Sequence, residues 1–493
     1  MRTTFSGISI ALRALQAQQV SLDITGHNVA NANNPNYSRQ TGLHSATRPY
    51  PAPMMGHNPS NGQLGTGVEI SQINRMRDTF VDLRLRQQLS SFHYWSAMED
   101  GLSQVELFFN EPGENGINQA LDQFWDSLQD LSREPDFNSV REVVVQRAQV
   151  LVESITTTRR QLQDLRENIN ENIPLKVQKI NSLSNRLADL NVQIGKISAT
   201  GSLPNDLLDS RDAILEELSE LIDIEVVQDH VNMVGVTVGG ASLVHRSTAY
   251  NMTTVGQASE EQGYQKNIVR WATTGNPVEI KSGEIGGLEA LRDVDIQRAI
   301  DDLDNWTKEL VERVNEVHDQ GWDLKDNEDA DGNLVESTPF FVFLNNNSDF
   351  AALNIMVNED LANDVSLIRA SSREGAIGNG ENALDLARLR FNRVVDTGIG
   401  SGDNSQITIG DAFRAIVSKL GVNTQKSIKM VENDETLAGH LRNLKESVSG
   451  VSLDEEMANM IRFQHAYGAA ARMMTAVDES LDTIINRLGI VGR

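Results

Sequence analysis

The chain has 493 residues, too many for one ordinary hydrophobic core, so its length favours two to four domains. Its formal net charge of −26 argues against a nucleic-acid partner, which would require clustered Lys and Arg to neutralise phosphates. The lack of cysteine excludes disulfides and cysteine zinc sites, and no stretch approaches the roughly 20 apolar residues of a membrane span.

The first predicted element is a helix with a narrow apolar stripe. Its apolar residues recur at alternating spacings of three and four, typical of a coiled-coil seam, with Gln19 completing the stripe. No apolar block precedes a small-residue cleavage site here, so we expect no cleaved signal peptide. The seam residues of this helix are Phe5, Ile8, Leu12, Leu15 and Leu22.

This helix continues into an asparagine-rich stretch, NVANANNPNYSRQ. Asparagine side chains compete with helical hydrogen bonds, and Pro35 disfavours a helical Asn34, so the helix ends here and an extended strand follows. The simpler interpretation is a helix terminator followed by a loop. The alternative is a docking surface of short amides, made by Asn28, Asn31, Asn33, Tyr37, Ser38, Arg39 and Gln40.

Several helical patterns follow. The longest, from Val144 to Ile197, would be about 80 Å long if unbroken, and Pro174 predicts a kink or break within it. The others begin near Ile73 and then cover 117–131, 206–221, 288–317 and 413–451. From Ile224 to Ile285 the pattern changes to period two with many glycines, which predicts a small β unit inserted between helices.

The last predicted helix repeats the narrow apolar stripe of the first. Neither helix can bury its stripe alone, so the simplest partner for each is the other or a neighbouring copy. Three acids, Asp454, Glu455 and Glu456, stand at its start, where we expect them to favour the helix dipole. Its seam residues are Leu453, Met457, Met460, Tyr467, Met474, Leu481, Ile485 and Leu488.

These elements predict a mainly α, elongated, multi-domain chain with a small β insert. We expect a terminal coiled-coil domain (1–45 and 450–493), a central bundle of long helices (46–223 and 286–449) and an inserted β domain (224–285).

The sequence offers little catalytic or metal-binding chemistry. Asn327, Asp329, Asp331 and Gly332 resemble half of a calcium loop, but Thr338 at the last position cannot supply the bidentate carboxylate. A solvated acidic turn is the better interpretation. No nucleotide-binding, hydrolase or metalloprotease motif is present, so we expect no catalytic residue, no metal and no cofactor.

The terminal motifs resemble those of a known family. The first helix with NVANANNPNYSRQ is similar to the signature of the flagellar axial proteins of rod, hook and hook-associated type, although Asn36 replaces the usual glycine. The stretches LGTGVEISQINRMRDTFVDLRLR, PNDLLDSRDAILEELSELIDIEV and GVSLDEEMANMIRFQHAYGAAARMMTAVDESLDTIINRLG narrow the resemblance to hook-associated members.

The resemblance implies a structural protein that joins hook to filament by self-assembly of its terminal helices. It also implies an extracellular position in the flagellum, reached through the flagellar type III channel. Implied partners are further copies, the hook protein, a second junction protein beside the filament, and a cytosolic export chaperone at the C-terminal segment.

Three alternatives remain at this stage. Another axial protein, of the hook or distal rod, would keep the terminal helices but should lack NDLLDSRD. An enzyme inserted in the variable region would need paired carboxylates or a metal motif, and the sequence shows neither. A cytosolic coiled-coil scaffold would share the seams but would not leave the cell.

Overall fold

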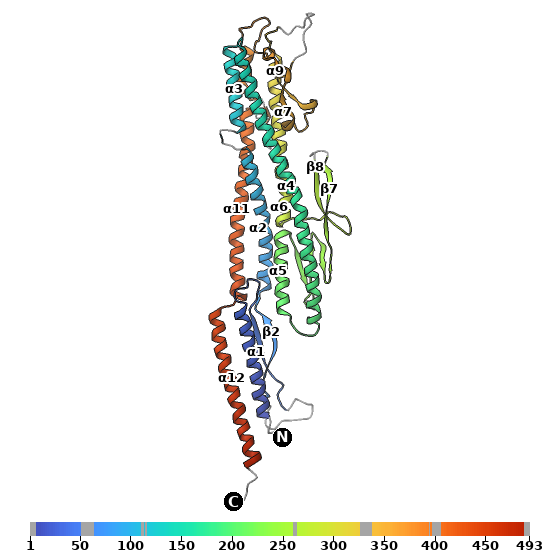
Figure 1. Cartoon of the computed structure of the whole chain (residues 1–493), viewed down its shortest axis with the longest axis vertical. Helices are drawn as coiled ribbons and strands as arrows, with labels where there is room; N and C mark the ends of the chain where they lie inside the picture. Colours follow the sequence, from blue (N-terminus) through green and yellow to red (C-terminus); the bar gives the residue numbers. More distant parts are fainter. Residues whose placement is uncertain are drawn as a thin grey trace.

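The computed structural model describes residues 6–50, 64–109, 113, 116–259, 264–325, 338–393, 395–396 and 406–487. The molecule is a long bundle of helices with small sheets at its side, and both chain ends lie at the same end (Figure 1). The predicted fold class, mainly α with a small β insert and elongated, is confirmed.

The terminal unit contains the first and last helices. Helix α1 (Ser6–Ala30) packs along α12 (Leu453–Asp482), which ends in a π-helical turn, Thr483–Arg487 (Figure 1). Strands β1 (Gln40–Ala46) and β2 (Val68–Arg75) form an antiparallel hairpin that packs on α1. Gly42 of β1 lies so close to α1 that an added Cβ would be 3.2 Å from Ile24 Cδ1.

The central bundle is built on long helices. Helix α2 (Thr79–Phe109) packs along α11 (Ile409–Ser449), and α3 (Ile117–Arg133) packs on α4. Helix α5 (Asn205–Leu221) contacts both α2 and α4. Helix α6 (Gly283–Ala290) continues through a π-helical turn, Leu291–Asp295, into α7 (Ile296–Asp319).

Helix α4 (Asn138–Ser198) has 61 residues, a length of about 90 Å. It is continuous through Pro174, so, of the predicted kink or break, the break is wrong. Ile173, Val177 and Ile180 are buried around the proline. Burying three such side chains stabilises the helix by more than the roughly 3 kcal/mol that an internal proline costs.

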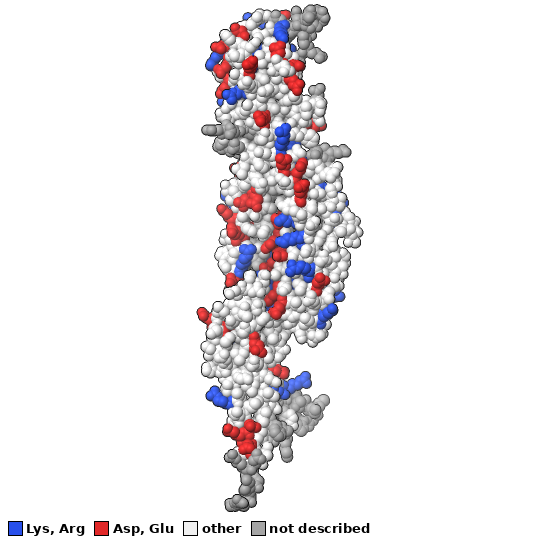
Figure 2. All heavy atoms as spheres, in the orientation of Figure 1, with Lys and Arg blue, Asp and Glu red and all other residues white. Residues whose placement is uncertain are grey.

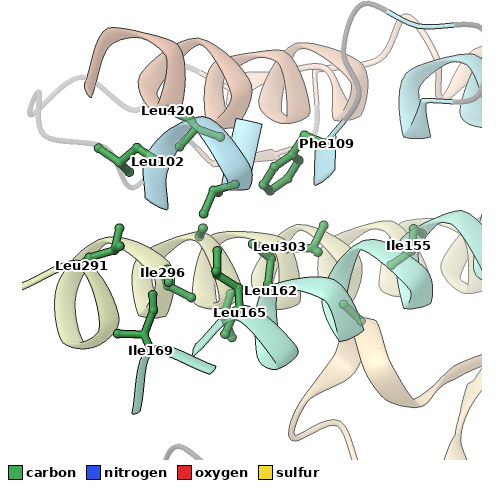
Figure 3. Close-up of a cluster of buried hydrophobic side chains, with 14 of the residues drawn as sticks. Leu102, Phe109, Ile155, Leu162, Leu165, Ile169, Leu291, Ile296, Leu303 and Leu420 are labelled. Atoms are coloured by element: carbon green, nitrogen blue, oxygen red, sulfur yellow. The ribbon is translucent and has the colours of Figure 1, made fainter. Parts of the chain in front are cut away.

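The core runs along the inner faces of these helices (Figure 3). It contains almost only aliphatic side chains in its middle, as the low aromatic content of 5% leads one to expect. The residues labelled in Figure 3 come from α2 (Leu102 and Phe109), α4 (Ile155, Leu162, Leu165 and Ile169), α11 (Leu420) and the Leu291–Asp319 segment (Leu291, Ile296 and Leu303).

The predicted β insert lies against α4. Four antiparallel strands form one sheet, and the hairpin of β7 (Met252–Ser259) and β8 (Tyr264–Trp271) forms another. Asparagines of α4 bind the strand backbones: Asn170 contacts Gln265 and Asn267, Asn181 contacts Met252, and Asn191 contacts Val234. The strands of the larger sheet are β3 (Glu225–Gln228), β4 (Val234–Val238), β5 (Ala241–His245) and β6 (Thr248–Ala249).

The end far from the termini contains short elements. Here β9 (Phe341–Phe343) pairs antiparallel with β10 (Ile355–Val357). Asn327, Asp329, Asp331 and Gly332 of the calcium-like pattern lie outside the described residues. The remaining elements are η2 (Leu344–Asn346), α8 (Ala351–Asn354), α9 (Glu359–Asn363), η3 (Val365–Leu367), α10 (Glu381–Arg388), β11 (Val395–Asp396) and β12 (Gln406–Ile407).

In the part of the chain that the structure describes, no three His, Asp or Glu side chains are grouped to hold a metal ion. None of the helices in the described part of the chain is long and apolar enough to cross a membrane.

His318 makes the far end sensitive to acid. Its imidazole is fully buried, its Nε2 accepts a hydrogen bond from the Arg369 backbone N–H at 3.1 Å, and the charged groups facing it are those of Arg369, Asp319 and Arg141. Burial, followed by the Arg369 charge, lowers the pKa of His318 to about 3.

We therefore expect the free energy of unfolding to fall as the pH drops from about 6.5 toward 3, because His318 binds a proton in the unfolded chain but not in the folded chain over this range. Between pH 6.5 and 5 the loss from this group should be about 2 kcal/mol. Calorimetric melting at the two pH values would test this, with His318→Gln, which keeps an acceptor and does not titrate, as the control. Equal pH dependence of the two proteins would contradict the assignment.

Candidate assembly site: the terminal helix pair and its joint

The terminal helices contact each other through small residues. Ala11 of α1 and Ala470 of α12 are buried, and a Cβ added at Gly7 would be only 3.2 Å from Cγ1 of Val477. Small side chains therefore let the two helix axes approach closely. The pair lies within one chain, as the sequence analysis allowed.

This contact uses only part of the predicted seams. Leu481 is buried, while Ile8, Leu15, Leu22, Met460 and Met474 are half-buried. The other seam residues face solvent: Leu12 (46% exposed), Leu453 (51%), Met457 (51%), Tyr467 (39%) and Ile485 (67%). Phe5 and Leu488 lie outside the described residues.

The buried face of α1 is partly polar, which explains the difference. Ser21 and Thr25 are buried with their hydroxyls donating to the carbonyls of Ala17 and Ser21, and Ser21 Oγ also lies 3.2 Å from His44 Nε2 of β1. This face packs toward the β1–β2 hairpin. A search for apolar periodicity misses such a face.

The asparagine-rich stretch folds back onto its own chain at the joint between the terminal unit and the bundle. Asn28 is buried and makes four hydrogen bonds. Its Nδ2 donates to Gln40 O (2.9 Å) and Glu456 Oε2 (3.0 Å), and its Oδ1 accepts from Tyr37 Oη (2.7 Å) and the Gln40 N–H (3.0 Å). One amide thus ties α1 to β1 and α12.

The next residues of the motif bind α5 and α12. Ser38 donates from its backbone N–H (3.0 Å) and its Oγ (2.7 Å) to the two carboxylate oxygens of Asp209. Arg39 binds Glu456 through Nε at 2.8 Å and Glu455 through Nη1 at 3.0 Å. Gln40 Nε2 donates to Asp206 Oδ1 at 2.9 Å. The docking motif is therefore satisfied largely within its own chain.

Asn31 and Asn33 take different positions. Asn31 donates its side-chain N–H to the His27 carbonyl at 3.0 Å, which caps the end of α1. Asn33 is exposed. Together with the residues that follow it, it lines a groove of about 770 Å³ between the asparagine turn and the α11–α12 connection. This groove is the part of the motif that is open to another molecule.

Beneath the motif lies a buried network of ion pairs. Arg75 binds Asp209 (2.7 Å) and Asp212 (3.0 Å), and Arg77 binds Asp82 (2.6 Å) and Asp212 (3.3 Å). Burial alone would raise the pKa of Asp212, but the arginines around it, Arg211 first, lower the pKa below its usual range. The carboxylate of Asp212 is thus charged in the folded chain at neutral pH.

Tyr37 stays a neutral donor. Burial raises its pKa, and the negative charges of Asp206, Asp209 and Glu456 raise it further. Its hydroxyl therefore keeps the proton that it donates to Asn28.

The joint adds contacts and residues that the sequence did not predict. Asp454, Glu455 and Glu456 lie in the first turn of α12, as expected, but Glu456 is also buried and paired with Arg39, and Ser452 caps the helix. Asp209, Asp212, Arg75 and Arg77 were not predicted. A signal existed: Asp206, Asp209, Asp212 and Glu216 recur every three or four residues, so these acids share one face of α5.

The chain was then compared with known proteins. A family model described as "Flagellar hook-associated protein FlgK helical domain" matches residues 102–334. The models "Flagella basal body rod protein" and "Flagellar basal body rod FlgEFG protein C-terminal" match 8–37 and 446–488. Flagellar hook-associated protein 1 of Bacillus subtilis is 31% identical over the full length of both chains.

The chain belongs to the flagellar hook-associated protein 1 family. The Salmonella typhimurium and Escherichia coli members are 23% and 24% identical, each aligned over 97% of this chain and 99% of its own. The structure of the flagellar hook junction protein FlgK from Burkholderia pseudomallei matches 74% of this chain and all of its own, with a TM-score of 0.60 and 16% identity, and so shares the fold.

Membership makes this chain a structural, hook-associated component of the flagellum. It also decides between a hook-associated protein and a hook or distal-rod protein, because the FlgK helical-domain model covers α4 and α5 and the B. subtilis relative matches throughout. The two rod-type models fall on α1 with its asparagine turn and on α12. The joint described above is therefore where the rod-like ends meet the hook-associated helical domain.

Proposed function

We propose that this protein joins hook to filament as a ring or tube of copies, with α1 and α12 as the assembling unit and without catalysis. The observation that carries this is the exposed apolar surface of the terminal unit. Exposed large apolar side chains there include Leu12, Val20, Leu453, Met457, Ile461, Tyr467, Met473, Ile484 and Ile485. Leu453, Met457 and Ile461 recur every four residues and so share one face of α12, and an exposed apolar patch of this kind is typical of an interface.

The charge distribution supports the same proposal. Figure 2 shows few charged side chains over the middle of the α1–α12 pair, whereas acids and bases crowd the middle of the bundle. A chain with a net charge of −26 can approach its own copies most readily where charge is absent. Within the predicted seams, the exposed residues are then the ones that meet other copies.

The proposed role as the hook–filament junction also implies partners and an export route. The expected partners are the hook protein, a second junction protein beside the filament, and a cytosolic export chaperone at the C-terminal segment. We propose an extracellular position in the flagellum, reached through the flagellar type III channel. For domains, we propose the division given above, with strand β2 moved into the terminal unit because it packs on α1.

A pair of charged substitutions tests the assembly surface. Met457→Asp should prevent polymerisation while α1 and α12 stay paired, because Met457 is exposed and contributes little to the pair. Leu481→Asp should prevent polymerisation and also separate the pair, because Leu481 is buried. Electron microscopy of polymers and amide exchange in α12 measure the two effects.

Thr475→Asp, on an exposed polar position of α12, is the matched control and should polymerise normally. Polymers of normal length from the Met457→Asp protein would refute the proposed surface. Locating the protein by labelling in isolated hook–basal bodies would test its position.

A further inference from the structure

Strand β7 presents an open edge on the flank of the molecule. The β7–β8 hairpin stands beside α4, on the side away from α2 and α11 (Figure 1). Met252 directs its backbone N–H and carbonyl to Asn181 rather than to β8. Because these directions alternate along an antiparallel strand, Thr254, Gly256 and Ala258 also point their backbone groups away from β8. In the described part of the chain, no group bonds to them.

The opposite edge of the same hairpin is largely occupied. Asn170 binds Gln265 O and the Asn267 N–H, and Arg292 donates to Asn267 O. Farther along β8, Val269 O accepts from the Val278 N–H, and the Trp271 N–H donates to Asn276 O. The fold therefore covers most of the β8 edge and leaves the β7 edge uncovered beyond Met252.

Strand β7 also has none of the features that usually protect an edge strand. Its sequence, MTTVGQAS, contains no charge and no proline, and its eight-residue register with β8 has no bulge. Among the other outer strands of described sheets, β3 has only four residues and carries Glu225. Strands β1 and β2 both pack on α1; β2 carries Glu69 and Arg75, and β1 has a register shift between Leu43 and His44. A long, uncharged edge strand is a template for pairing with another strand.

We propose that the β7 edge pairs antiparallel with the β7 edge of a second copy of this chain. The three outward-facing residues are spaced evenly about Gly256, so a two-fold axis there pairs Thr254 with Ala258 of the other copy and forms about six hydrogen bonds. Gly256 brings no side chain to the axis. The lack of charge on β7 also suits self-pairing in a chain whose net charge is −26.

This pairing is distinct from assembly through the terminal helices. Strand β7 runs roughly along the long axis of the molecule (Figure 1), so an antiparallel pair places two copies in opposite directions. Copies in one tube point the same way. The β7 pair is therefore a dimer of unassembled chains, and it competes with tube formation.

Sedimentation of the full chain tests the proposal. The Met457→Asp background separates this contact from terminal assembly, and the concentration should span about 1 to 500 µM because a small interface is weak. We expect dimers with a dissociation constant of roughly 10⁻⁴ M. Thr254→Pro combined with Ala258→Pro removes outward N–H groups at positions where an edge tolerates proline, and should weaken the dimer at least about tenfold.

Thr254→Val combined with Ala258→Val keeps the N–H groups and should leave the dimer intact. In the parent, the Gly256 amide should exchange more slowly as the protein concentration rises. In the proline variant, continued protection of the Val255 amide, whose N–H points to β8, shows that the hairpin is intact. A parent that stays monomeric at the highest concentration, a proline variant that dimerises as well, or Gly256 exchange that ignores concentration would each overturn the proposal.

Discussion

Replacing Asp209 with alanine should release the asparagine turn from α5. The carboxylate of Asp209 accepts two hydrogen bonds from Ser38 and pairs with Arg75, and all three groups are largely buried. Its removal leaves a buried N–H and a buried guanidinium without this partner, which costs roughly 3–5 kcal/mol. The joint should then open far more often, while the distant bundle is unaffected.

Amide exchange measures this opening directly. The Ser38 and Arg39 amides, which donate to Asp209 and to the Ser449 carbonyl, should exchange at least about a hundredfold faster. Asp206→Ala is the matched control on the same face of α5: its side chain is 68% exposed and binds Gln40 and His27. It should cost under about 1 kcal/mol. Similar exchange in the two variants would show that Asp209 is not the anchor.

Replacing Asn28 with aspartate should damage the joint through repulsion rather than through a cavity. The Nδ2 group of Asn28 donates to Glu456 Oε2 and to Gln40 O, so an aspartate oxygen there would face a carboxylate and a carbonyl. Two buried carboxylates about 3 Å apart cannot both be charged without a large penalty, and we expect a loss of about 3 kcal/mol or more at neutral pH.

The stability of the Asn28→Asp protein should depend on pH. The like charge raises the pKa of the folded carboxylate pair, so the folded Asn28→Asp protein binds more protons than its unfolded state, and its stability should recover as the pH falls toward 5. Adding Glu456→Gln supplies an amide donor in place of the opposing carboxylate. The double variant should therefore be more stable than Asn28→Asp alone, with a coupling of roughly 1–3 kcal/mol.

Asn31→Asp provides the comparison on the same helix. Asn31 is partly exposed and makes its 3.0 Å bond to the His27 carbonyl, so aspartate there should cost under about 1 kcal/mol. Melting curves at pH 7 and 5 distinguish the outcomes. If Glu456→Gln worsens Asn28→Asp instead of relieving it, the pairing of Asn28 with Glu456 does not control the joint.

Local patterns in the sequence predicted much of the architecture. The spacing of aliphatic residues located α3, α4, α5 and α11 to within a few residues, and period-two alternation located the β insert. These predictions succeed because the residues that bury one face of a helix or a strand lie close together in the chain and so form a local pattern. The break at Pro174 failed because packing of Ile173 and Val177 outweighs one missing hydrogen bond.

The joint was harder to predict because its partners are far apart in sequence. Ser38 and Asp209 are separated by 171 positions, and Asn28 and Glu456 by 428. Each residue, taken alone, has an ordinary explanation as a turn former, a helix cap or a surface charge. Only the folded chain brings donor and acceptor together, and α1 offers mainly hydroxyl and amide groups to that contact.

The connection between α11 and α12 spans only Gly450 to Ser452, and such a short link would normally act as a pivot. Arg39 is held on both sides of it, by the Ser449 carbonyl before the link and by Glu456 after it. A change in angle between the two helices must therefore lengthen the Arg39–Glu456 ion pair or the hydrogen bond from Arg39 to Ser449. In the proposed tube of copies, each subunit should therefore behave as a rigid rod when the flagellum flexes. Bending should then occur by sliding between neighbouring subunits.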